Sequence, residues 1–387
     1  MAAAERLIVH AITPGDHFSP STGSAVSTGI DAIARAANRV GGLRHAVLVA
    51  KGTFPDRYPS ADVIEYQPFT WGGRRRRVLD VAAGRVTGRR PFATHDLRAM
   101  LADQQRWPES YVIAHNLVDL VSGIDTRHAA LLSAHNQLFR TYGHRELRHA
   151  LKGIHAILSV SDHLGNELIT RLPKEFHDRV HVVPNGVDSD AFYPTDRPEG
   201  PTVRVGYVGR VVPHKGADVL LHAVKLLNRT DVEVRIIGSQ GFDAGIALSP
   251  YEEQLRRDAA SLRGAVHFEP FVDRFRLPAL MRELDVLVVP SRWPEPWGQV
   301  ATEGLASGLA VVASRIGGLP EAVGPAGVLV PPDDAPALAS ALEGLVADFR
   351  LRQQLGKRAR AWALQLTWQR SWTALATALG ESPMVPT

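Results

Sequence analysis

Short apolar runs alternate with amphipathic segments along the whole chain of 387 residues. In the first half, three segments have apolar residues at helical spacing and predict helices: 24–40, 97–106 and 140–153. The apolar runs around them predict strands at 7–12, 46–50, 111–114, 129–134 and 154–160, and residues 179–193 predict one more strand that ends in a turn. Alternation of this kind favours right-handed βαβ units and an open parallel sheet, so the predicted fold class is α/β.

The same alternation restarts in the second half. It predicts strands at 203–208, 232–237, 285–290, 310–313 and 328–330, and helices at 217–227, 251–262, 277–283 and 335–346. Between the halves, residues 193–201 are polar and without periodicity, which is typical of a domain boundary. We therefore predict a first domain at 1–193, a second at 194–362, and a C-terminal helix at 363–387 that crosses back to brace the first domain.

Composition narrows the class of protein. Hydrophobic residues make up 45% of the chain and charged residues 22%, which suits globular domains with buried cores. The chain has no cysteine, so disulfides and thiolate metal sites are excluded, and the reducing cytoplasm is the expected compartment. We find no apolar run of membrane-spanning length and no signal-peptide pattern at the start.

The net charge is only +4, but part of the basic surplus is concentrated in one run, formed by Arg74, Arg75, Arg76 and Arg77. Such a run suits a polyanionic ligand or peripheral contact with a membrane surface. A solvated loop is the favoured interpretation. Nucleic-acid binding is not expected, because no aromatic side chains are interleaved with the arginines.

The segment S-R-W-P-E-P-W-G-Q-V-A-T-E, residues 291–303, carries the most chemical information. It follows a predicted buried strand, and its prolines and Gly298 exclude regular structure before a helix begins. The unpaired N–H groups at a helix start suit an anion. Glu295 and Glu303 flank this point, and a carboxylate beside a phosphate would be repelled. We therefore expect the two glutamates to hold hydroxyl groups, as in a ligand with a sugar, a diphosphate and a ribose in that order.

The segment G-Y-V-G-R-V-V-P-H-K-G, residues 206–216, follows the first strand of the second half. Gly209 allows the backbone to approach a ligand, and a helix beginning near Gly216 would supply N–H groups. Arg210 and Lys215 are positioned to converge on one diphosphate. Two cations near glycines are a weak signal alone, and the acidic segment in the same half strengthens it.

Loops after three strands of the first half are also candidates. The first, residues 13–24, is rich in Gly, Pro and hydroxyls and presents Gly23 to a phosphate or sugar, although an ordinary capped connection is equally favoured. His115 and His135 each follow a later strand, where histidine hydrogen-bonds a ligand oxygen or moves a proton. The chain has 16 histidines, so a structural role has even odds for any one of them.

The D-S-D triplet formed by Asp188 and Asp190 has the spacing of a metal pair. A cap and turn is the favoured interpretation, since no strand leads directly into it and no third ligand is evident. We therefore predict no metal site.

Several of these motifs together resemble a known family. E-P-W-G-Q-V-A-T-E resembles the E-x7-E element of retaining, nucleotide-sugar-dependent glycosyltransferases of family 4 (glycosyltransferase group 1). G-R-V-V-P-H-K-G resembles their phosphate-grasping loop, V-P-N-G-V-D-S-D-A-F their interdomain signature, and S-R-I-G-G-L-P-E their glycine turn. L-D-V-L-V-V-P-S before the acidic segment fits as well. The motifs occur in the family's order and span most of residues 155–331.

The resemblance implies the GT-B architecture, in which two Rossmann-like, doubly wound parallel-sheet domains face each other across a cleft. It implies that Glu303 holds the ribose hydroxyls, that Glu295 faces the donor sugar, and that Arg210 and Lys215 neutralise the diphosphate. The remaining implied donor-site contacts come from Gly209, Val272 near the base, and the backbone of Trp297, Gly298, Gln299 and Val300.

The first domain is implied to bind the acceptor, with His135 near the reacting carbon. Two positions depart from the family's pattern. Gly23 stands in S-T-G-S where relatives often have a double glycine, and Trp297 stands where phenylalanine is commoner.

The implied reaction is a metal-independent transfer of a hexosyl group from a nucleoside diphosphate to an acceptor hydroxyl, with retention. Uridine is favoured over guanosine because that donor is commoner in the family. The acceptor stays open among lipid carriers, polysaccharide ends and small natural products. Alternatives are a GT-B nucleotide-sugar epimerase and a nucleotide-sugar-binding protein without catalysis; a membrane- or nucleic-acid-binding module using the arginine run is a third.

Overall fold

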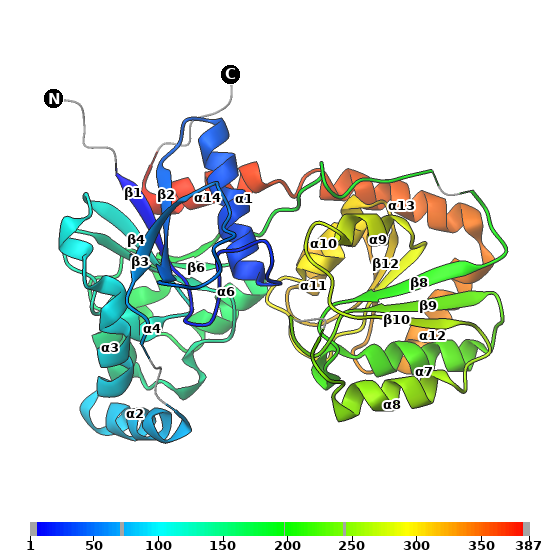
Figure 1. Ribbon diagram of the computed structural model, residues 1–387, viewed down its shortest axis with the longest axis horizontal. Coiled ribbons are helices and arrows are strands. Elements are labelled where there is room, and N and C mark those ends of the chain that lie inside the picture. The colour runs from blue at the N-terminus through cyan, green and yellow to red at the C-terminus, as the bar shows by residue number, and fades with distance from the viewer. Residues whose placement is uncertain (1–5, 70–72, 197, 243–244, 382–387) are drawn as a thin grey trace. The chain divides into compact units, whose positions relative to one another are not determined.

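The computed structural model describes residues 6–69, 73–196, 198–242 and 245–381. Its contacts divide the chain into two units: residues 1–20, 24–184 and 368–387 form the first, and residues 21–23 and 185–367 form the second (Figure 1). Residues 185–193 thus group with the second unit by their contacts. The predicted bounds 1–193, 194–362 and 363–387 stay a prediction, and the chain ends 1–5 and 382–387 lie outside the described residues.

The first unit is built on a seven-stranded sheet whose strands are all parallel. The order β3-β2-β1-β4-β5-β6-β7 reverses the direction of strand addition between β1 and β4. Its strands are β1 (Leu7–Ala11), β2 (Arg44–Ala50), β3 (Asp62–Tyr66), β4 (Ser110–His115), β5 (Ala129–Ala134), β6 (Ala156–Ser159) and β7 (Val180–Val182). Its helices are α1 (Ala25–Arg39), α2 (Arg74–Thr87), α3 (Pro91–Leu97), α4 (Val118–Val121), α5 (His144–Ala150), α6 (Asp162–Ile169) and α14 (Trp368–Leu379).

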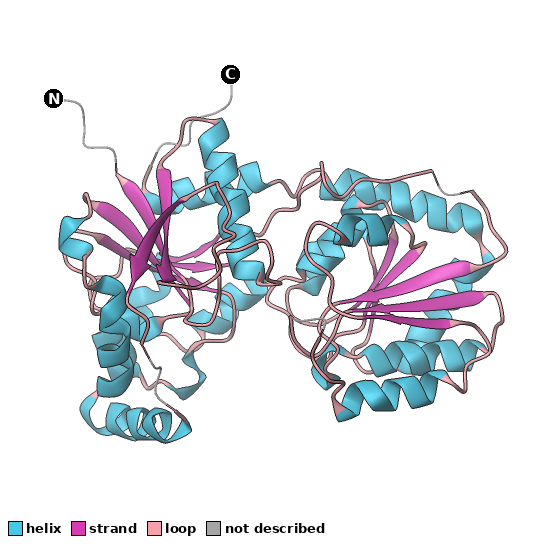
Figure 2. Cartoon of the chain, viewed as in Figure 1, coloured by secondary structure: helices cyan, strands magenta, loops and turns pink. Residues whose placement is uncertain are grey.

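The second unit repeats this plan with six parallel strands in the order β10-β9-β8-β11-β12-β13, which reverses between β8 and β11. Its strands are β8 (Val203–Val208), β9 (Val232–Ile237), β10 (Val266–Glu269), β11 (Val286–Val289), β12 (Ala310–Ser314) and β13 (Val328–Val330). Its helices are α7 (Ala217–Leu227), α8 (Pro250–Ala259), α9 (Leu277–Arg282), α10 (Gln299–Ala306), α11 (Leu319–Val323), α12 (Ala335–Ala347) and α13 (Phe349–Ala363). Helices flank both faces of this sheet (Figure 2).

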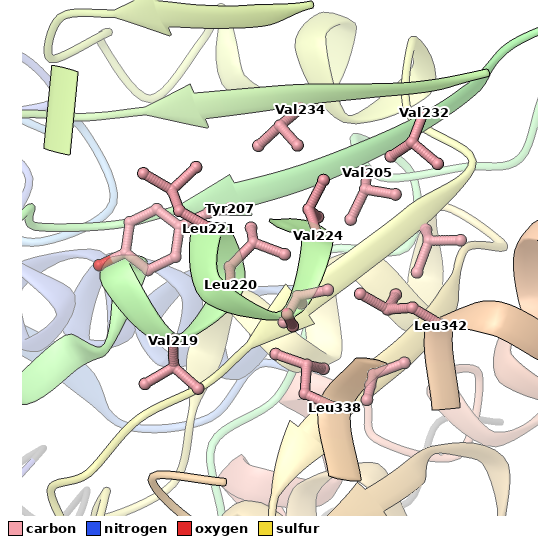
Figure 3. Packing of buried hydrophobic residues seen from close by; sticks show 14 of the residues in the cluster. Val205, Tyr207, Val219, Leu220, Leu221, Val224, Val232, Val234, Leu338 and Leu342 are labelled. Atoms are coloured by element: carbon pink, nitrogen blue, oxygen red, sulfur yellow. The ribbon is translucent and has the colours of Figure 1, made fainter. Parts of the chain in front are cut away.

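One face of the second sheet is covered by an apolar core that involves α7, α8 and α12. Alternate residues of the strands, such as Val205 and Tyr207, point into it and meet Leu220 of α7 and Leu338 of α12 (Figure 3). Because successive strand side chains alternate between faces, the residues between them point to the other face of the sheet. On the other face, Gly304 lets α10 approach β11 closely: a Cβ at this position would lie 2.3 Å from Leu287 Cδ2.

The C-terminal helix α14 belongs to the core of the first unit. Trp372 and Leu375 pack with Ile8 of β1 and Ile113 of β4, and α1 lies in the same cluster. Trp372 is only 3% exposed. Gly42 makes room for it, since a Cβ there would lie 2.6 Å from the indole. The last described helix of the chain therefore packs against the first sheet, although its residues are far from those strands in the sequence.

The predicted strands appear in the structure, with two additions. The sequence analysis missed β3 and β10, which are the edge strands of their sheets. In β10, V-H-F-E, apolar and polar residues alternate, and in β3, D-V-I-E-Y, acidic residues flank two apolar ones, so neither has the continuous apolar run of a buried parallel strand.

Two predictions were wrong. The helix expected over 97–106 consists of the end of α3 and two short 3-10 turns, Arg98–Leu101 and Gln104–Arg106. The arginine run 74–77 was expected in a loop, but it begins the helix α2 after Gly73. Arginine is a good helix former, so the run tolerates this conformation. In the described part of the chain, every helix is too short or too polar to span a bilayer.

We predict that Trp372→Ala lowers the free energy of unfolding of the first unit by about 3–5 kcal/mol, because it removes a buried indole and leaves a cavity. Urea unfolding followed by far-ultraviolet circular dichroism measures this change. Thr373→Ala, at an exposed position of the same helix, is the matched control and should change stability by less than about 0.5 kcal/mol. Equal stability of the two variants would contradict the packing role of α14.

Candidate donor site at the switch point of the second sheet

The candidate site lies where strand order reverses in the second sheet. Strands β8 and β11 pair with each other there, and their following loops carry the two motifs of the sequence analysis. In open parallel sheets, ligands bind beyond the carboxyl ends of the strands at such a switch point. The topology therefore places the basic loop 209–216 and the acidic loop 290–298 side by side.

Backbone contacts hold these two loops together. Gly216 has φ of 75°, and a Cβ there would lie 2.0 Å from the carbonyl oxygen of Pro290. The carbonyl oxygen of His214 accepts hydrogen bonds from the N–H groups of Arg292 (2.9 Å) and Trp293 (3.2 Å). Only glycine allows both the left-handed conformation and the close approach, so Gly216 is required for the loops to touch.

A partly exposed charge network braces the same junction. Arg292 donates to both carboxylate oxygens of Asp218 at 2.7 Å and to Asp333 at 2.6 Å. Burial alone would raise the pKa of Asp218, but hydrogen bonds from Arg292 and Tyr251 hold it below its usual range. Tyr251 Oη also accepts the N–H of Asp218 at 3.2 Å. One N–H at the start of α7, a helix expected to supply donors to a ligand, is thus already used.

Lys215 and Glu295 meet directly. The ammonium group donates to both carboxylate oxygens of Glu295, at 2.6 and 2.8 Å, and Ser291 Oγ donates to one of them at 2.5 Å. Glu295 is 7% exposed. The sequence analysis assigned these two residues to different parts of a ligand, and the structure shows that they also neutralise each other. A lysine has three N–H donors, so Lys215 retains donor capacity beyond this pair.

The glycine turn at 317–318 supports the acidic loop from behind. Gly318 donates its N–H to the carbonyl oxygen of Glu295 at 2.6 Å, and a Cβ on Gly317 would lie 2.4 Å from that oxygen. Gly298 has φ of 103° and precedes α10, where Gln299 binds the carbonyl oxygen of Gly186 through its side chain at 2.9 Å. The chain therefore turns sharply into α10 and directs the helix N-terminus, with the backbone of residues 297–300, to this edge.

Glu303 is buried one turn inside α10, and its partner was not predicted. Arg274 NH2 lies 2.6 Å from Glu303 Oε1, and the same guanidinium lies 5.1 Å from the ring centroid of Phe192. Glu303 is 1% exposed. Arg274 follows β10, a strand that the apolar pattern did not reveal, so its position in the sheet was not predictable. The only signal was its place in a polar loop near the predicted base site.

Two donors of the site lack partners. Arg210 is exposed, and its side chain forms no hydrogen bond or ion pair with any residue that the structure describes. Nε1 of Trp297 is buried and has no hydrogen-bond partner among the described residues, although Trp297 is only 5% exposed. Arg210 is therefore available to ligand oxygens, whereas Nε1 of Trp297 is enclosed by the protein. The space beside Gly209 (φ of 144°) is open to a ligand. The nearest atom to a Cβ placed on this residue would be Tyr207 Oη, at 4.0 Å.

The remaining predicted contacts lie nearby or in the first unit. Val272 is partly buried after β10, next to Phe271, whose N–H donates to Ser239 Oγ at 3.0 Å. Gly23 groups with the second unit by its contacts: a Cβ on it would lie 2.4 Å from the ring of Phe242. His135 belongs to the first unit. None of these assignments is tested by the geometry alone, so the roles stay predictions.

His135 is half-buried beyond the end of β5 and ends a row of histidines. Its Nε2 lies 2.9 Å from His115 Nδ1, and His115 Nε2 lies 2.9 Å from His10 Nδ1. His10 Nε2 in turn lies 2.8 Å from His45 Nδ1. Burial lowers the pKa of His45 to about 3 and that of His135 to about 4. Burial, together with the neighbouring histidines, also lowers the pKa values of His10 and His115 well below 6.5.

Two other candidates take no part in this site. Asp188 Oδ1 accepts the N–H groups of Asp190 and Ala191, which confirms the predicted turn. Arg76 pairs with Asp96 at 3.5 Å, and Arg75 and Arg77 are exposed, while the side chain of Arg74 lies outside the described part. Membrane contact through this run stays a prediction. Within the described residues, no group of three His, Asp or Glu side chains has the arrangement of a metal site.

With this geometry in place, we compared the chain with known proteins. Residues 195–362 match the family described as Glycosyl transferases group 1. HepE (Alr3699) of Anabaena, solved with UDP and glucose, superposes with a TM-score of 0.71 at 19% identity, over 97% of this chain and 99% of that one. Sucrose-phosphate synthase of Thermosynechococcus elongatus superposes with a TM-score of 0.73 at 21% identity, over 97% and 98%. The chain has the GT-B fold.

Curated relatives with this type of domain are more similar in sequence but are covered only in part. Spore coat protein SA of Bacillus subtilis (strain 168) is 29% identical over 262 residues, which cover 62% of this chain and 69% of that protein. D-inositol 3-phosphate glycosyltransferase of Corynebacterium diphtheriae is 37% identical over 188 residues, 47% of this chain and 43% of that protein. D-inositol 3-phosphate glycosyltransferase of Corynebacterium jeikeium is 36% identical over 219 residues, which cover 53% of this chain and 52% of that protein. The GT-B chain thus spans about half the length of these glycosyltransferases.

We predict that the GT-B chain loses stability as pH falls below 6.5. In the unfolded chain the four histidines of the row take up protons near pH 6.5, whereas in the folded state they stay neutral until a much lower pH. Each such histidine lowers the free energy of unfolding by about 1.4 kcal/mol per pH unit below 6.5, until its folded pKa is reached. Urea unfolding between pH 7.5 and 5 measures this slope.

The matched pair for this measurement is His45→Phe and His144→Gln. Loss of the buried His45 should reduce the slope of the free energy of unfolding against pH by about the 1.4 kcal/mol per pH unit expected for one histidine. Replacement of the exposed His144 should leave this slope unchanged. A slope that is the same in both variants and the parent protein would show that the row does not control the acid sensitivity.

Proposed function

We propose that this protein is a glycosyltransferase that moves a hexosyl group from a nucleoside diphosphate sugar to an acceptor hydroxyl. The observation that carries the proposal is the junction of two loops at the switch point of the second sheet. There a basic loop with Arg210 and Lys215 adjoins an acidic loop that ends at the N-terminus of α10. The match of residues 195–362 to Glycosyl transferases group 1 supports the same class of reaction, and it does not favour the epimerase alternative.

In this proposal the diphosphate lies at the start of α10, between the amides of residues 298–300 and the two cations. The bond from the sugar carbon to the diphosphate oxygen breaks while negative charge grows on the leaving diphosphate. Fixed positive groups aimed at that charge stabilise the transition state without reorganising. The exposed, unpaired Arg210 suits a bidentate contact with phosphate oxygens. Lys215 adds a second charge while its remaining donors keep Glu295 in place.

The two glutamates are proposed to hold hydroxyls on either side of the diphosphate. Glu295 would accept from a hydroxyl of the donor sugar, with its charge balanced by Lys215 and its orientation set by Ser291. Glu303 would accept from the ribose hydroxyls, with Arg274 balancing its buried charge. The transfer is proposed to proceed with retention, as the resemblance of the motifs implies. It is proposed to need no metal ion, because cations of the chain itself can take the leaving-group charge.

We propose uridine as the base of the donor, near Val272. The likeness to HepE, whose structures contain UDP with glucose or UDP-glucose, supports this choice through the shared fold. The acceptor is proposed to bind the first unit, close to His135. Its chemical class is left open, among lipid carriers, polysaccharide ends and small natural products, since the family match covers the second unit.

Lys215→Met is expected to lower kcat about a hundredfold, because one lost contact to transition-state charge is worth about 3 kcal/mol. The same change leaves the buried carboxylate of Glu295 unpaired, so it should also lower stability. The double variant Lys215→Met/Glu295→Gln separates the two effects: it should regain stability but not turnover. Steady-state transfer from UDP-glucose and urea unfolding are measured on both variants.

The control for this series is Lys225→Met, at an exposed position of α7, the helix that follows Lys215, and this variant should retain parental kinetics and stability. A double variant that regains turnover along with stability would contradict the phosphate role of Lys215, because its effect would then come from the ion pair alone.

Glu303→Gln is expected to weaken binding of UDP about 10- to 100-fold, since a hydrogen bond to a charged group contributes about 1.5–3 kcal/mol. Isothermal titration calorimetry with UDP, GDP and dTDP measures this affinity and identifies the base in the same experiment. Glu343→Gln, at an exposed position of α12, is the control and should bind as the parent does. Parental UDP affinity in Glu303→Gln would rule out the ribose contact.

A further inference from the structure

The row of four histidines crosses the first sheet in a straight diagonal. His45 lies in β2, His10 in β1, His115 at the end of β4 and His135 just beyond β5, and these strands are neighbours. In the register of each strand pair, the next histidine lies two residues beyond the position opposite its neighbour. Because side chains alternate with a period of two, all four rings lie on the same face of the sheet.

Each link of the row joins one Nδ1 to one Nε2. The three N···N distances are 2.8, 2.9 and 2.9 Å, and the rings stack with centroids 5.1 to 5.2 Å apart. A neutral imidazole has one N–H donor and one acceptor nitrogen. If one ring donates through Nδ1, the next accepts at Nε2 and must itself carry its proton on Nδ1. All links therefore point in the same direction, and only two polarities of the whole row exist.

The rings are neutral at physiological pH, so these two polarities are the relevant states. His10 is 2% exposed, His45 2% and His115 5%. Burial and the neighbouring rings lower the pKa values of His10 and His115, and burial lowers that of His45 to about 3 and that of His135 to about 4.

The buried end of the row distinguishes the polarities. Nε2 of His45 is buried and has no hydrogen-bond partner among the described residues, and the ring lies 5.6 Å from that of Trp372. In one polarity this atom is a bare acceptor nitrogen, and in the other it is an N–H group without an acceptor. Buried N–H groups without a partner are rare in proteins, whereas buried acceptors without a partner are somewhat more common. The row is therefore favoured with every proton on Nδ1, pointing from His45 toward His135.

We propose that His45, His10 and His115 are positioning residues that hold His135 in a single tautomer, with its proton on Nδ1. Nε2 of His135 lies 2.9 Å from His115 Nδ1 and 3.1 Å from Ser133 Oγ, a hydroxyl that can donate to it or accept from it and so selects no tautomer alone. Its Nδ1–H is the nitrogen left for a ligand. His135 then acts as a hydrogen-bond donor toward a hydroxyl or ring oxygen and does not act as a general base. This choice of ligand oxygen rests on the proposed function, whereas the tautomer rests on the row alone.

Nuclear magnetic resonance of protein labelled with nitrogen-15 in histidine tests the tautomers directly at pH 7.5. Two-bond correlations between ring nitrogens and carbon-bound protons distinguish a protonated Nδ1 from a protonated Nε2. We expect His10, His45, His115 and His135 all to carry the proton on Nδ1. A proton on Nε2 of any of them, as would follow if His45 donated to the ring of Trp372, would overturn the proposal.

A matched pair of variants at His115 tests the coupling. Asparagine carries its amide at about the place of Nδ1, so His115→Asn keeps a donor for His135, whereas His115→Leu removes it. We expect His135 to keep its Nδ1 proton in the Asn variant and to show both tautomers in the Leu variant. A single Nδ1 tautomer in the Leu variant would overturn the positioning role. If the Leu variant does not fold, the tautomers of the parent protein and of the Asn variant still decide.

Transfer kinetics separate this inference from the proposed function. If His135 donates to a ligand oxygen, His115→Leu should lower kcat at least about tenfold, and His115→Asn should recover most of it. No transfer by the parent protein from any nucleotide sugar, with the tautomers as expected, would reject the proposed function and leave the positioning role intact. Tautomers other than those expected, with transfer observed, would reject only the positioning role.

Discussion

The organisation of the candidate site depends on the contact between the loops that follow β8 and β11. Gly216 allows the first loop to touch the carbonyl of Pro290, and the His214 carbonyl accepts two N–H groups of the second loop. Without that contact, the basic and acidic motifs would be separate surface loops with independent motions. With it, the start of α10 and the cations occupy one rigid edge of a parallel sheet, where backbone donors already converge.

Charge balance explains how such a site exists before a ligand arrives. Two buried carboxylates at the edge of a sheet would be costly if they were unpaired, and each has a cation: Lys215 for Glu295 and Arg274 for Glu303. The pairs balance the charge of the two acids and hold their side chains in place. Arg210 is exposed at the same edge, and an exposed cation of this kind raises the rate of encounter with an anion.

The first sheet shows the same principle with neutral groups. In its row of histidines, hydrogen bonds link most of the ring nitrogens, and the rings also stack. Trp372 of α14 covers the end of the row at His45. The C-terminal helix therefore contributes to more than packing, because it excludes water from the row. A row that is dry and fully linked has few alternative arrangements, which is why its open end at His135 is well defined.

The sequence by itself determined the fold class, most of the strands and both loops of the donor site, because apolar periodicity and glycine- and proline-containing turns are local properties. It did not reveal β3 or β10, since edge strands lack a continuous apolar run, nor Arg274, whose place depends on β10. Only the tertiary structure decided that Lys215 pairs with Glu295 and that four histidines align. Pairings of this kind depend on strand order and register, which bring residues together that are as many as 105 positions apart in the chain.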